Sequence, residues 1–156
     1  MTGVVVLGAT GSIGTQAADV LEAHADRFRV RGLASHRKGP EVLALARRLG
    51  APVIALVDPA AADALRAHLR PGDPEVRVGE AAVVSLVDGT DVDVVVQGIT
   101  GAAGLASSLR AAERGKRLAL ANKESMVVAG PLLTATAARH GAEIVPVDSE
   151  HCAIHQ

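Results

Sequence analysis

Residues 4–14 of the chain read Val-Val-Val-Leu-Gly-Ala-Thr-Gly-Ser-Ile-Gly, and this stretch decides the fold. Four apolar residues, three of them β-branched, predict a buried strand that ends at Leu7. Three glycines follow at regular spacing, and a helical pattern begins directly after them. Gly8 allows a tight turn, Gly11 allows close approach of a pyrophosphate, and Gly14 allows the helix to pack on the strand. A strand, a glycine-rich turn and a helix in this order predict a dinucleotide site.

The helix that follows this turn would offer free N–H groups and a partial positive charge to a phosphate. The hydroxyls of Thr10 and Ser12 add further donors. The spacing is G-x-x-G-x-x-G rather than G-x-G-x-x-G, and a glycine-rich turn alone also occurs in plain strand-to-helix connections. The position of the turn between a first strand and a helix favours the nucleotide site.

The residues after the second expected strand indicate which dinucleotide binds. They are Ser35-His36-Arg37-Lys38, whereas an NAD site usually has an acidic residue here that holds the ribose 2′-hydroxyl. Cationic side chains suit the additional 2′-phosphate of NADP. The sequence therefore favours NADPH, with Arg37 and Lys38 as ligands of the 2′-phosphate. A solvated basic loop is the alternative.

Apolar, β-branched runs alternate with Ala- and Leu-rich helical stretches along the whole chain. This alternation predicts an α/β fold with a doubly wound, mostly parallel sheet, that is, a Rossmann-like NADP-binding domain. The expected strands cover residues 4–7, 28–33, 53–57, 76–78, 92–96, 118–121 and 144–147. The expected helices cover residues 13–23, 40–49, 59–69, 80–87, 105–114 and 132–140.

The composition argues against several function classes. The net charge of −1 gives no basic surface for nucleic acid, and Phe28, the only aromatic residue, gives no platform on which bases could stack. No run of about 18 apolar residues predicts a transmembrane helix, and the amino-terminal residues do not resemble a signal peptide. The single Cys152 fits a reducing compartment. We therefore expect a cytoplasmic protein that contacts neither membrane nor nucleic acid.

Two further motifs follow later strands. Gly98-Ile99-Thr100-Gly101-Ala102-Ala103-Gly104 comes after the strand at 92–96, and Asn122-Lys123-Glu124 comes after the strand at 118–121. Open α/β sheets bind ligands at the carboxyl ends of their strands, where both motifs are expected. Taken alone, the second motif fits a helix cap with a solvated salt bridge equally well.

Asp148, Ser149 and Glu150 follow the last expected strand. In an extended chain, Asp148 and Glu150 point to the same side, roughly 6.5 Å apart, and repel each other unless a cation lies between them. A hard divalent ion with oxygen ligands suits such a pair. His151 and His155 have the spacing of a helical zinc pair, but neither a Cys nor a third His at ligand spacing supports that reading.

The motifs G-A-T-G-S-I-G, G-A-A-G-L, L-A-N-K-E-S and P-V-D-S-E-H occur in this order over nearly the whole chain. Together they resemble the 1-deoxy-D-xylulose 5-phosphate reductoisomerase family of the non-mevalonate isoprenoid pathway. The resemblance implies isomerisation of 1-deoxy-D-xylulose 5-phosphate and its reduction with NADPH to 2-C-methyl-D-erythritol 4-phosphate. It also implies a Mn²⁺, Mg²⁺ or Co²⁺ ion that chelates this phosphosugar substrate and, for the full-length protein, a homodimer.

The resemblance also assigns roles to residues at matching motif positions. The NADPH contacts would be Thr10, Gly11, Ser12, Ile13, Asn122 and Glu124. The substrate contacts would be Lys123, Ser149 and Glu150, of which Lys123 and Glu150 would be catalytic. The metal ligands would be Asp148 and Glu150.

The chain departs from the family at two strand ends. Ser35-His36-Arg37-Lys38 replaces the more usual A-G-x-N, and Gln97-Gly98-Ile99-Thr100 replaces N-A-I-V. The family continues beyond residue 156 with a third metal-binding glutamate. We therefore expect residues 1–147 to be the NADPH-binding domain and residues 148–156 to start a catalytic domain, inactive without the rest. Two alternatives stay open: an NADP-dependent oxidoreductase of semialdehyde dehydrogenase type, which would need a catalytic Cys, and a stand-alone NADP-binding module.

Overall fold

The apolar run near the start of the chain forms β1 (Thr2–Leu7), the central strand of a seven-stranded sheet. Its side chains alternate between the two faces, because successive Cβ atoms point to opposite sides of a strand. Val4 and Val6 belong to one apolar core, Val5 and Leu7 belong to the other, and none is more than 1% exposed. A strand that is buried on both faces has to be apolar throughout, which explains the continuous run.

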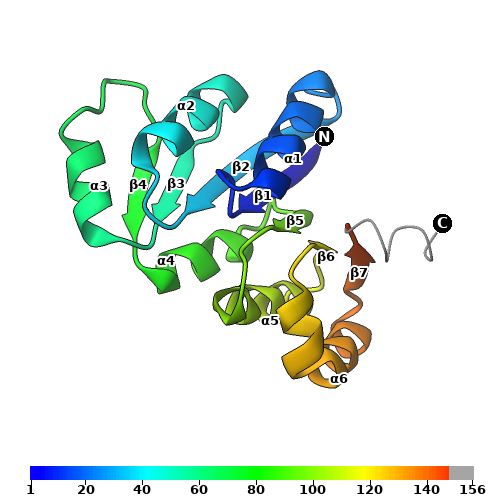
Figure 1. Ribbon diagram of the computed structural model, residues 1–156. Helices are drawn as coiled ribbons and strands as arrows, with labels where there is room; N and C mark the ends of the chain where they lie inside the picture. Colours follow the sequence, from blue (N-terminus) through cyan, green and yellow to red (C-terminus); the bar gives the residue numbers. More distant parts are fainter. Residues whose placement is uncertain (148–156) are drawn as a thin grey trace.

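The computed structural model describes residues 1–147, and every strand pair in it is parallel (Figure 1). The strand order is β4-β3-β2-β1-β5-β6-β7. The other strands are β2 (Phe28–Ser35), β3 (Val53–Leu56), β4 (Glu75–Val78), β5 (Val94–Gln97), β6 (Arg117–Leu120) and β7 (Glu143–Pro146). The chain winds outward from β1 to β4 and then returns to the other side of β1. The expected doubly wound sheet is therefore confirmed, and its order reverses between β1 and β5.

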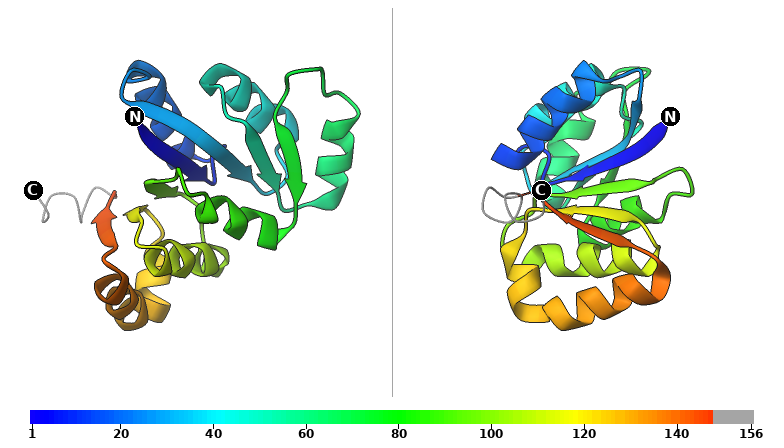
Figure 2. Two further views of the ribbon diagram at one scale, coloured as in Figure 1. Left: turned by 180° about the vertical axis from the view of Figure 1, so that it is seen from behind. Right: turned by 90° about the vertical axis from the view of Figure 1, so that its right-hand side faces the viewer.

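Helices cover both faces of the sheet (Figure 2). One face packs against α1 (Ser12–Ala23), α2 (Gly39–Leu49) and α3 (Pro59–Arg66). The other face packs against α4 (Glu80–Ser85), α5 (Leu105–Glu113) and α6 (Lys123–His140), with short 3₁₀ turns η1 (Leu86–Asp88) and η2 (Ala102–Gly104). Within residues 1–147, no helix combines the length and the apolar character needed to cross a membrane.

The main departure from the expected elements is α6, which begins at Lys123 rather than at residue 132. The side chain of Asn122 caps this helix by accepting a hydrogen bond from the N–H of Ser125, at 3.0 Å. The helix is kinked at Ala129, where φ is −137° and ψ is 24°. Pro131 follows the kink, and its ring both lacks an N–H and clashes with the preceding turn. The helix expected at 132–140 is the part beyond the kink; the other elements agree to within a few residues.

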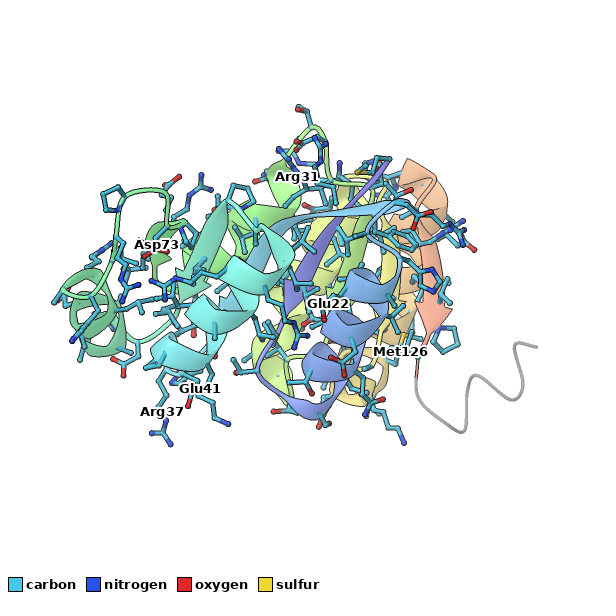
Figure 3. The ribbon with its side chains drawn as sticks, turned by 90° about the horizontal axis from the view of Figure 1, so that it is seen from above. Glu22, Arg31, Arg37, Glu41, Asp73 and Met126 are labelled. Atoms are coloured by element: carbon cyan, nitrogen blue, oxygen red, sulfur yellow. The ribbon has the colours of Figure 1, made fainter. Side chains whose placement is uncertain are left out.

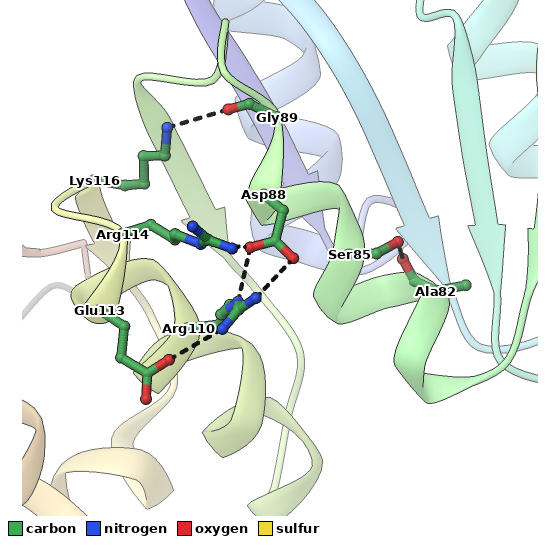
Figure 4. Close-up of polar contacts among 8 residues, drawn as sticks. All are labelled: Ala82, Ser85, Asp88, Gly89, Arg110, Glu113, Arg114 and Lys116. Atoms are coloured by element: carbon green, nitrogen blue, oxygen red, sulfur yellow. Dashed lines mark hydrogen bonds and ion pairs between the residues drawn. The ribbon is translucent and has the colours of Figure 1, made fainter.

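An ion-pair network holds the turn that leads into β5 (Figure 4). The carboxylate of Asp88 accepts hydrogen bonds from Arg110, at 2.7 and 3.1 Å, and from Arg114, at 2.7 Å. The hydrogen bonds from Arg110 and Arg114 lower the pKa of Asp88, although partial desolvation opposes them. Lys116 donates to the carbonyl oxygens of Gly89 and Val92, at 3.1 and 2.6 Å. These contacts tie the carboxyl end of α5, and the residues that follow it, to the segment before β5.

Candidate functional site

The glycine turn after β1 is shaped by the absence of two side chains. Gly8 has a φ of +75°, and a Cβ there would lie 2.7 Å from the main chain of Gly98. A Cβ on Gly14 would lie 2.3 Å from the carbonyl oxygen of Gly8 and 2.5 Å from the Cα of Ala9. The predicted roles of Gly8 in a tight turn and of Gly14 in close helix packing are therefore confirmed. The turn also packs directly against the loop that follows β5.

Gly11 differs from the other two glycines because its surroundings are open. It is exposed, its φ is −81°, and a Cβ there would meet only the carbonyl oxygen of Gly8, at 3.4 Å. Gly11 is the N-cap residue of α1, and no side chain caps this helix. The first N–H groups of the helix therefore lack an intrahelical acceptor, and Ser12, where the helix begins, is exposed. This arrangement suits a phosphate, and the contacts predicted for Ser12 and Ile13 remain predictions.

The loops after β1 and β2 lie side by side. The hydroxyls of Thr10 and Ser35 are 2.8 Å apart, and Ala9 donates its N–H to the carbonyl oxygen of Ala34, also at 2.8 Å. The exposed side chains of Arg37 and Lys38 follow directly. Figure 3 shows Arg37 projecting outward beside the start of α2, toward the opposite end of the strands from Arg31.

The cations of this loop are not neutralised locally. Across residues 1–147, no carboxylate lies within ion-pair distance of Arg37 or Lys38, whereas Arg47 and Arg48 on the following helix are both paired. An arginine and a lysine without acidic partners, next to the uncapped start of α1, form a surface that attracts a phosphate.

A cavity of about 280 Å³ lies where the strand order reverses, at the carboxyl ends of the strands. It is bordered by the turn after β1, the end of β2, helix α4 and the loop after β5. The residues that shape it include Gly8, Ser35, His36, Glu80, Ile99 and Ala102. Open α/β sheets bind their ligands at this reversal point.

A second cavity, of about 330 Å³, lies at the carboxyl end of β6. Its lining includes Asn122, Lys123, Met126 and Pro146. Lys123 and Glu124 are exposed, whereas Asn122 is only 3% exposed. The predicted catalytic and substrate-binding Lys123 therefore borders a hollow of the surface. Its ligand contacts, and those of Glu124, remain predictions.

Asn122 has two structural roles that the sequence showed only in part. Its Oδ1 caps α6, which confirms the helix-cap reading. Its Nδ2 donates to the carbonyl oxygens of Ile99 and Gly101, at 2.8 and 2.9 Å. Both side-chain donors are therefore used within the protein. The predicted contact between Asn122 and NADPH remains a prediction, and the side-chain amide has no donor left for it.

Sequence reasoning missed Gln97, the last residue of β5, which is completely buried. Its Oε1 accepts from the N–H of Ile99 at 3.1 Å, and its Nε2 donates to the carbonyl oxygen of Gly104 at 3.1 Å. The available signal was a polar residue at the end of an otherwise apolar strand, in a position where the chain departs from the family pattern.

The predicted metal and substrate residues Asp148, Ser149 and Glu150 lie outside the described residues, as do His151, Cys152 and His155. Within residues 1–147, no group of three or more His, Cys, Asp or Glu side chains is arranged to hold a metal ion. The metal site therefore rests on the sequence alone.

The profile of the 1-deoxy-D-xylulose 5-phosphate reductoisomerase family matches residues 4–130 of the chain. A 1-deoxy-D-xylulose 5-phosphate reductoisomerase from Anaeromyxobacter sp. (strain K) is 51% identical over 156 residues, which are all of this chain and 40% of the relative. The enzyme of the same name from Mycolicibacterium smegmatis is 49% identical, over 98% of this chain and 36% of the relative. The chain thus spans 40% or less of these relatives' length.

Solved structures show the same similarity. The reductoisomerase from Zymomonas mobilis in complex with NADPH superimposes with a TM-score of 0.91 at 38% identity, over 96% of this chain and 39% of that one. A DOX-P reductoisomerase in complex with NADPH, fosmidomycin and magnesium also gives 0.91 at 38% identity, over 97% of this chain and 37% of that one. A putative homoserine dehydrogenase from Archaeoglobus fulgidus, 19% identical with a TM-score of 0.60, shares the fold alone. The semialdehyde dehydrogenase alternative is set aside, and the chain belongs to the 1-deoxy-D-xylulose 5-phosphate reductoisomerase family.

Proposed function

We propose that residues 1–147 form the NADPH-binding domain of a 1-deoxy-D-xylulose 5-phosphate reductoisomerase and that residues 148–156 begin its catalytic domain. Two observations carry this proposal: the start of α1 has no side-chain cap, and Arg37 and Lys38, in the loop that contacts Thr10 through Ser35, have no ion-pair partner within residues 1–147. A pyrophosphate on the helix and a 2′-phosphate on the cationic loop would be bound at once. The relatives of known structure that bind NADPH support this reading.

The protein that carries this chain would isomerise 1-deoxy-D-xylulose 5-phosphate and reduce the product to 2-C-methyl-D-erythritol 4-phosphate. Bound NADPH would supply the hydride. Thr10, Gly11, Ser12 and Ile13 would hold its phosphates through main-chain N–H groups and hydroxyls. Lys123, at the second cavity, would place a fixed positive charge beside the phosphosugar substrate.

Asp148 and Glu150 would bind a Mn²⁺, Mg²⁺ or Co²⁺ ion, since paired carboxylates at this spacing need a cation between them. Such an ion supplies Lewis acidity toward substrate oxygens. Ser149 and Glu150 would contact the substrate, and Glu150 would also be catalytic. Glu124 would contact NADPH. The full-length protein would be a homodimer.

Titration of the chain with NADPH and NADH tests the cofactor proposal. NADPH should bind more tightly, and Arg37→Ala and Lys38→Ala should each weaken NADPH binding by about 1–3 kcal/mol while leaving NADH binding nearly unchanged. Arg48→Ala is the matched control, because Arg48 lies at the far end of α2 and pairs with Asp19 and Glu22. Equal affinity for the two cofactors would contradict the proposal.

The metal ligands are tested in a protein of the relatives' full length. Asp148→Asn should abolish metal-dependent turnover and spare NADPH binding, because the dinucleotide loop lies at the other end of the sequence. The alternative is that Asp148 merely caps a helix. Asp58→Ala provides the reference for that outcome, since Asp58 caps α3 through the N–H of Ala60, at 3.1 Å. A cap loss would cost about 1 kcal/mol of stability and little activity.

The 156-residue chain should bind NADPH without consuming it when 1-deoxy-D-xylulose 5-phosphate is added. It offers two candidate metal carboxylates, whereas a site that chelates a substrate needs further ligands and a closed cavity. The measurement is absorbance of NADPH over time, and turnover by this chain would contradict the division into domains.

A further inference from the structure

The loop between β5 and α5, residues 98–104, is fixed from inside the sheet by Gln97. This side chain is completely buried, and both ends of its amide are bonded to the loop. Its Oε1 accepts from the N–H of Ile99, and its Nε2 donates to the carbonyl oxygen of Gly104, both at 3.1 Å. The Nε2 also contacts the Ser107 hydroxyl at 2.6 Å, at the start of α5. A buried amide is costly unless its groups are paired, and here the loop pairs them.

Asn122 holds the same loop from the end of β6. Its Nδ2 lies between the carbonyl oxygens of Ile99 and Gly101, at 2.8 and 2.9 Å. Gly104 gives this amide its space, because a Cβ there would lie 2.1 Å from the Nδ2 of Asn122. The orientation of both amides is fixed, since each nitrogen faces carbonyl oxygens and each amide oxygen faces an N–H.

Ile99 is the residue that both amides share. Gln97 binds its N–H and Asn122 binds its carbonyl oxygen, so the peptide units on its two sides are held by separate strands. The side of this loop that is not bound by the amides faces the cavity where the strand order reverses, through Ile99, Ala102 and Ala103. The two amides therefore set the position of one wall of that cavity.

We propose that Gln97 and Asn122 are positioning residues for the dinucleotide: together they fix residues 98–104 as a wall of the cofactor cavity, without side-chain contact with the cofactor. This inference rests on the proposed NADPH function. It assigns a role to Gln97 and lets Asn122 act on NADPH through the loop. Two residues that act through one loop should also depend on each other, which distinguishes this role from two independent contacts.

The variants that test the inference remove the hydrogen bonds between these amides and the loop. Gln97→Met keeps nearly the same volume without an amide. Asn122→Asp keeps an oxygen that caps α6 but has no donor for the loop. Thr136→Val is the matched control, because it removes one hydrogen bond, to the carbonyl oxygen of Leu132, from a buried residue that lines neither cavity. The measurements are the Kd for NADPH, the melting temperature without cofactor, and amide hydrogen exchange at Ile99.

Each single variant should weaken NADPH binding about tenfold or more, the range expected when buried polar partners are left unpaired. The Kd of the double variant for NADPH should be hardly higher than that of whichever single variant binds NADPH more weakly. The Ile99 amide should exchange faster in Gln97→Met, and Thr136→Val should lower the melting temperature without changing the Kd. Asn122→Asp carries the test if Gln97→Met does not fold.

Two results would overturn the inference while leaving the proposed function intact. One is that the wild-type protein binds NADPH and the variants bind it with the same Kd. The other is full additivity of the two substitutions, which would indicate independent contacts. Failure of the wild-type chain to bind NADPH would instead overturn the proposed function, and the inference with it.

Discussion

Two loops face each other across the reversal point of the sheet, and they are held in opposite ways. The turn after β1 is fixed by missing side chains, since added Cβ atoms at Gly8 and Gly14 would lie within 2.7 Å of main-chain atoms. The loop after β5 is instead fixed by side chains that bind it, the buried amides of Gln97 and Asn122. The first loop packs on the main chain of its own turn and of Gly98. The second is bound by Gln97, two and seven residues from its partners, and by Asn122, 23 and 21 residues from its partners.

Because of this difference, the two loops should respond differently to amino-acid substitutions. Gly8 and Gly14 pack on main chain that cannot move aside, so a side chain at either position displaces the backbone. A loop held by side-chain amides can adjust, because the far end of an amide can turn away at the cost of its hydrogen bonds. The first loop should therefore fail abruptly on substitution, and the second should fail by degrees.

Substitution within the first glycine turn should give the largest effect. Gly14→Ala should destabilise the fold by about 3 kcal/mol, because the gain in helix propensity does not offset overlap with the main chain of Gly8 and Ala9. Gly11→Ala should leave the stability nearly unchanged, since its surroundings are open, yet weaken NADPH binding. Urea unfolding and NADPH titration of both variants make the comparison. Equal stability of the two variants would show that packing does not fix this turn.

Gly104→Ala should cost less, about 1–2 kcal/mol, because the new methyl group overlaps the end of the Asn122 side chain, at 2.1 Å, and lies no nearer than 3.2 Å to main chain, at the carbonyl oxygen of Ile99. The same substitution should cost still less when Asn122 is replaced by Ser, since the clashing amide is then absent. Urea unfolding of the two single variants and the double variant measures this coupling. Purely additive losses would mean that Asn122 is not what restricts this position.

The smallest effect on stability is expected at the amino ends of the strands, away from both loops. Hydrogen bonds from Arg47 and from the N–H of Arg70 hold the pKa of Asp73 at about 2, well below its usual 3.8. The folded-state pKa is thus lowered, so this stabilisation is present above pH 4 and is lost as the pH falls toward 2. Asp73→Asn should be less stable than wild type at neutral pH, and the difference should vanish in acid.

This substitution also serves as a control for the two loops. NADPH affinity at neutral pH should be the same in Asp73→Asn as in wild type, because the loop around Asp73 lies at the amino ends of the strands and the cofactor cavity lies at their carboxyl ends. Acid titration of unfolding and one NADPH titration measure both quantities. A change in affinity would mean that the two ends of the strands are coupled.

The sequence predicted those parts of the molecule whose cause is local. The apolar run 4–7, the glycine turn and the alternation of elements follow from neighbouring residues, and the structure confirms them. The cap at Asn122 was among the expectations, but the expected helix 132–140 left out the first part of α6, because exposed Val127 and Val128 and the nearby Pro131 hide the helical pattern. Gln97 could not be interpreted because its partners lie in a loop whose shape is set by the tertiary fold. Asp148 and Glu150 are predictions from sequence and lie outside the described residues.

The direction of β1 has a practical consequence. Met1 is 72% exposed and lies at the amino end of the strand, whereas Gly8 lies at the carboxyl end. Six residues at roughly 3.3 Å each separate the amino terminus from the glycine turn by about 20 Å. If the protein is attached to a sensor surface through its amino terminus, the glycine turn should therefore face the solution. The immobilised protein should then bind the cofactor with the same affinity as protein that is free to diffuse.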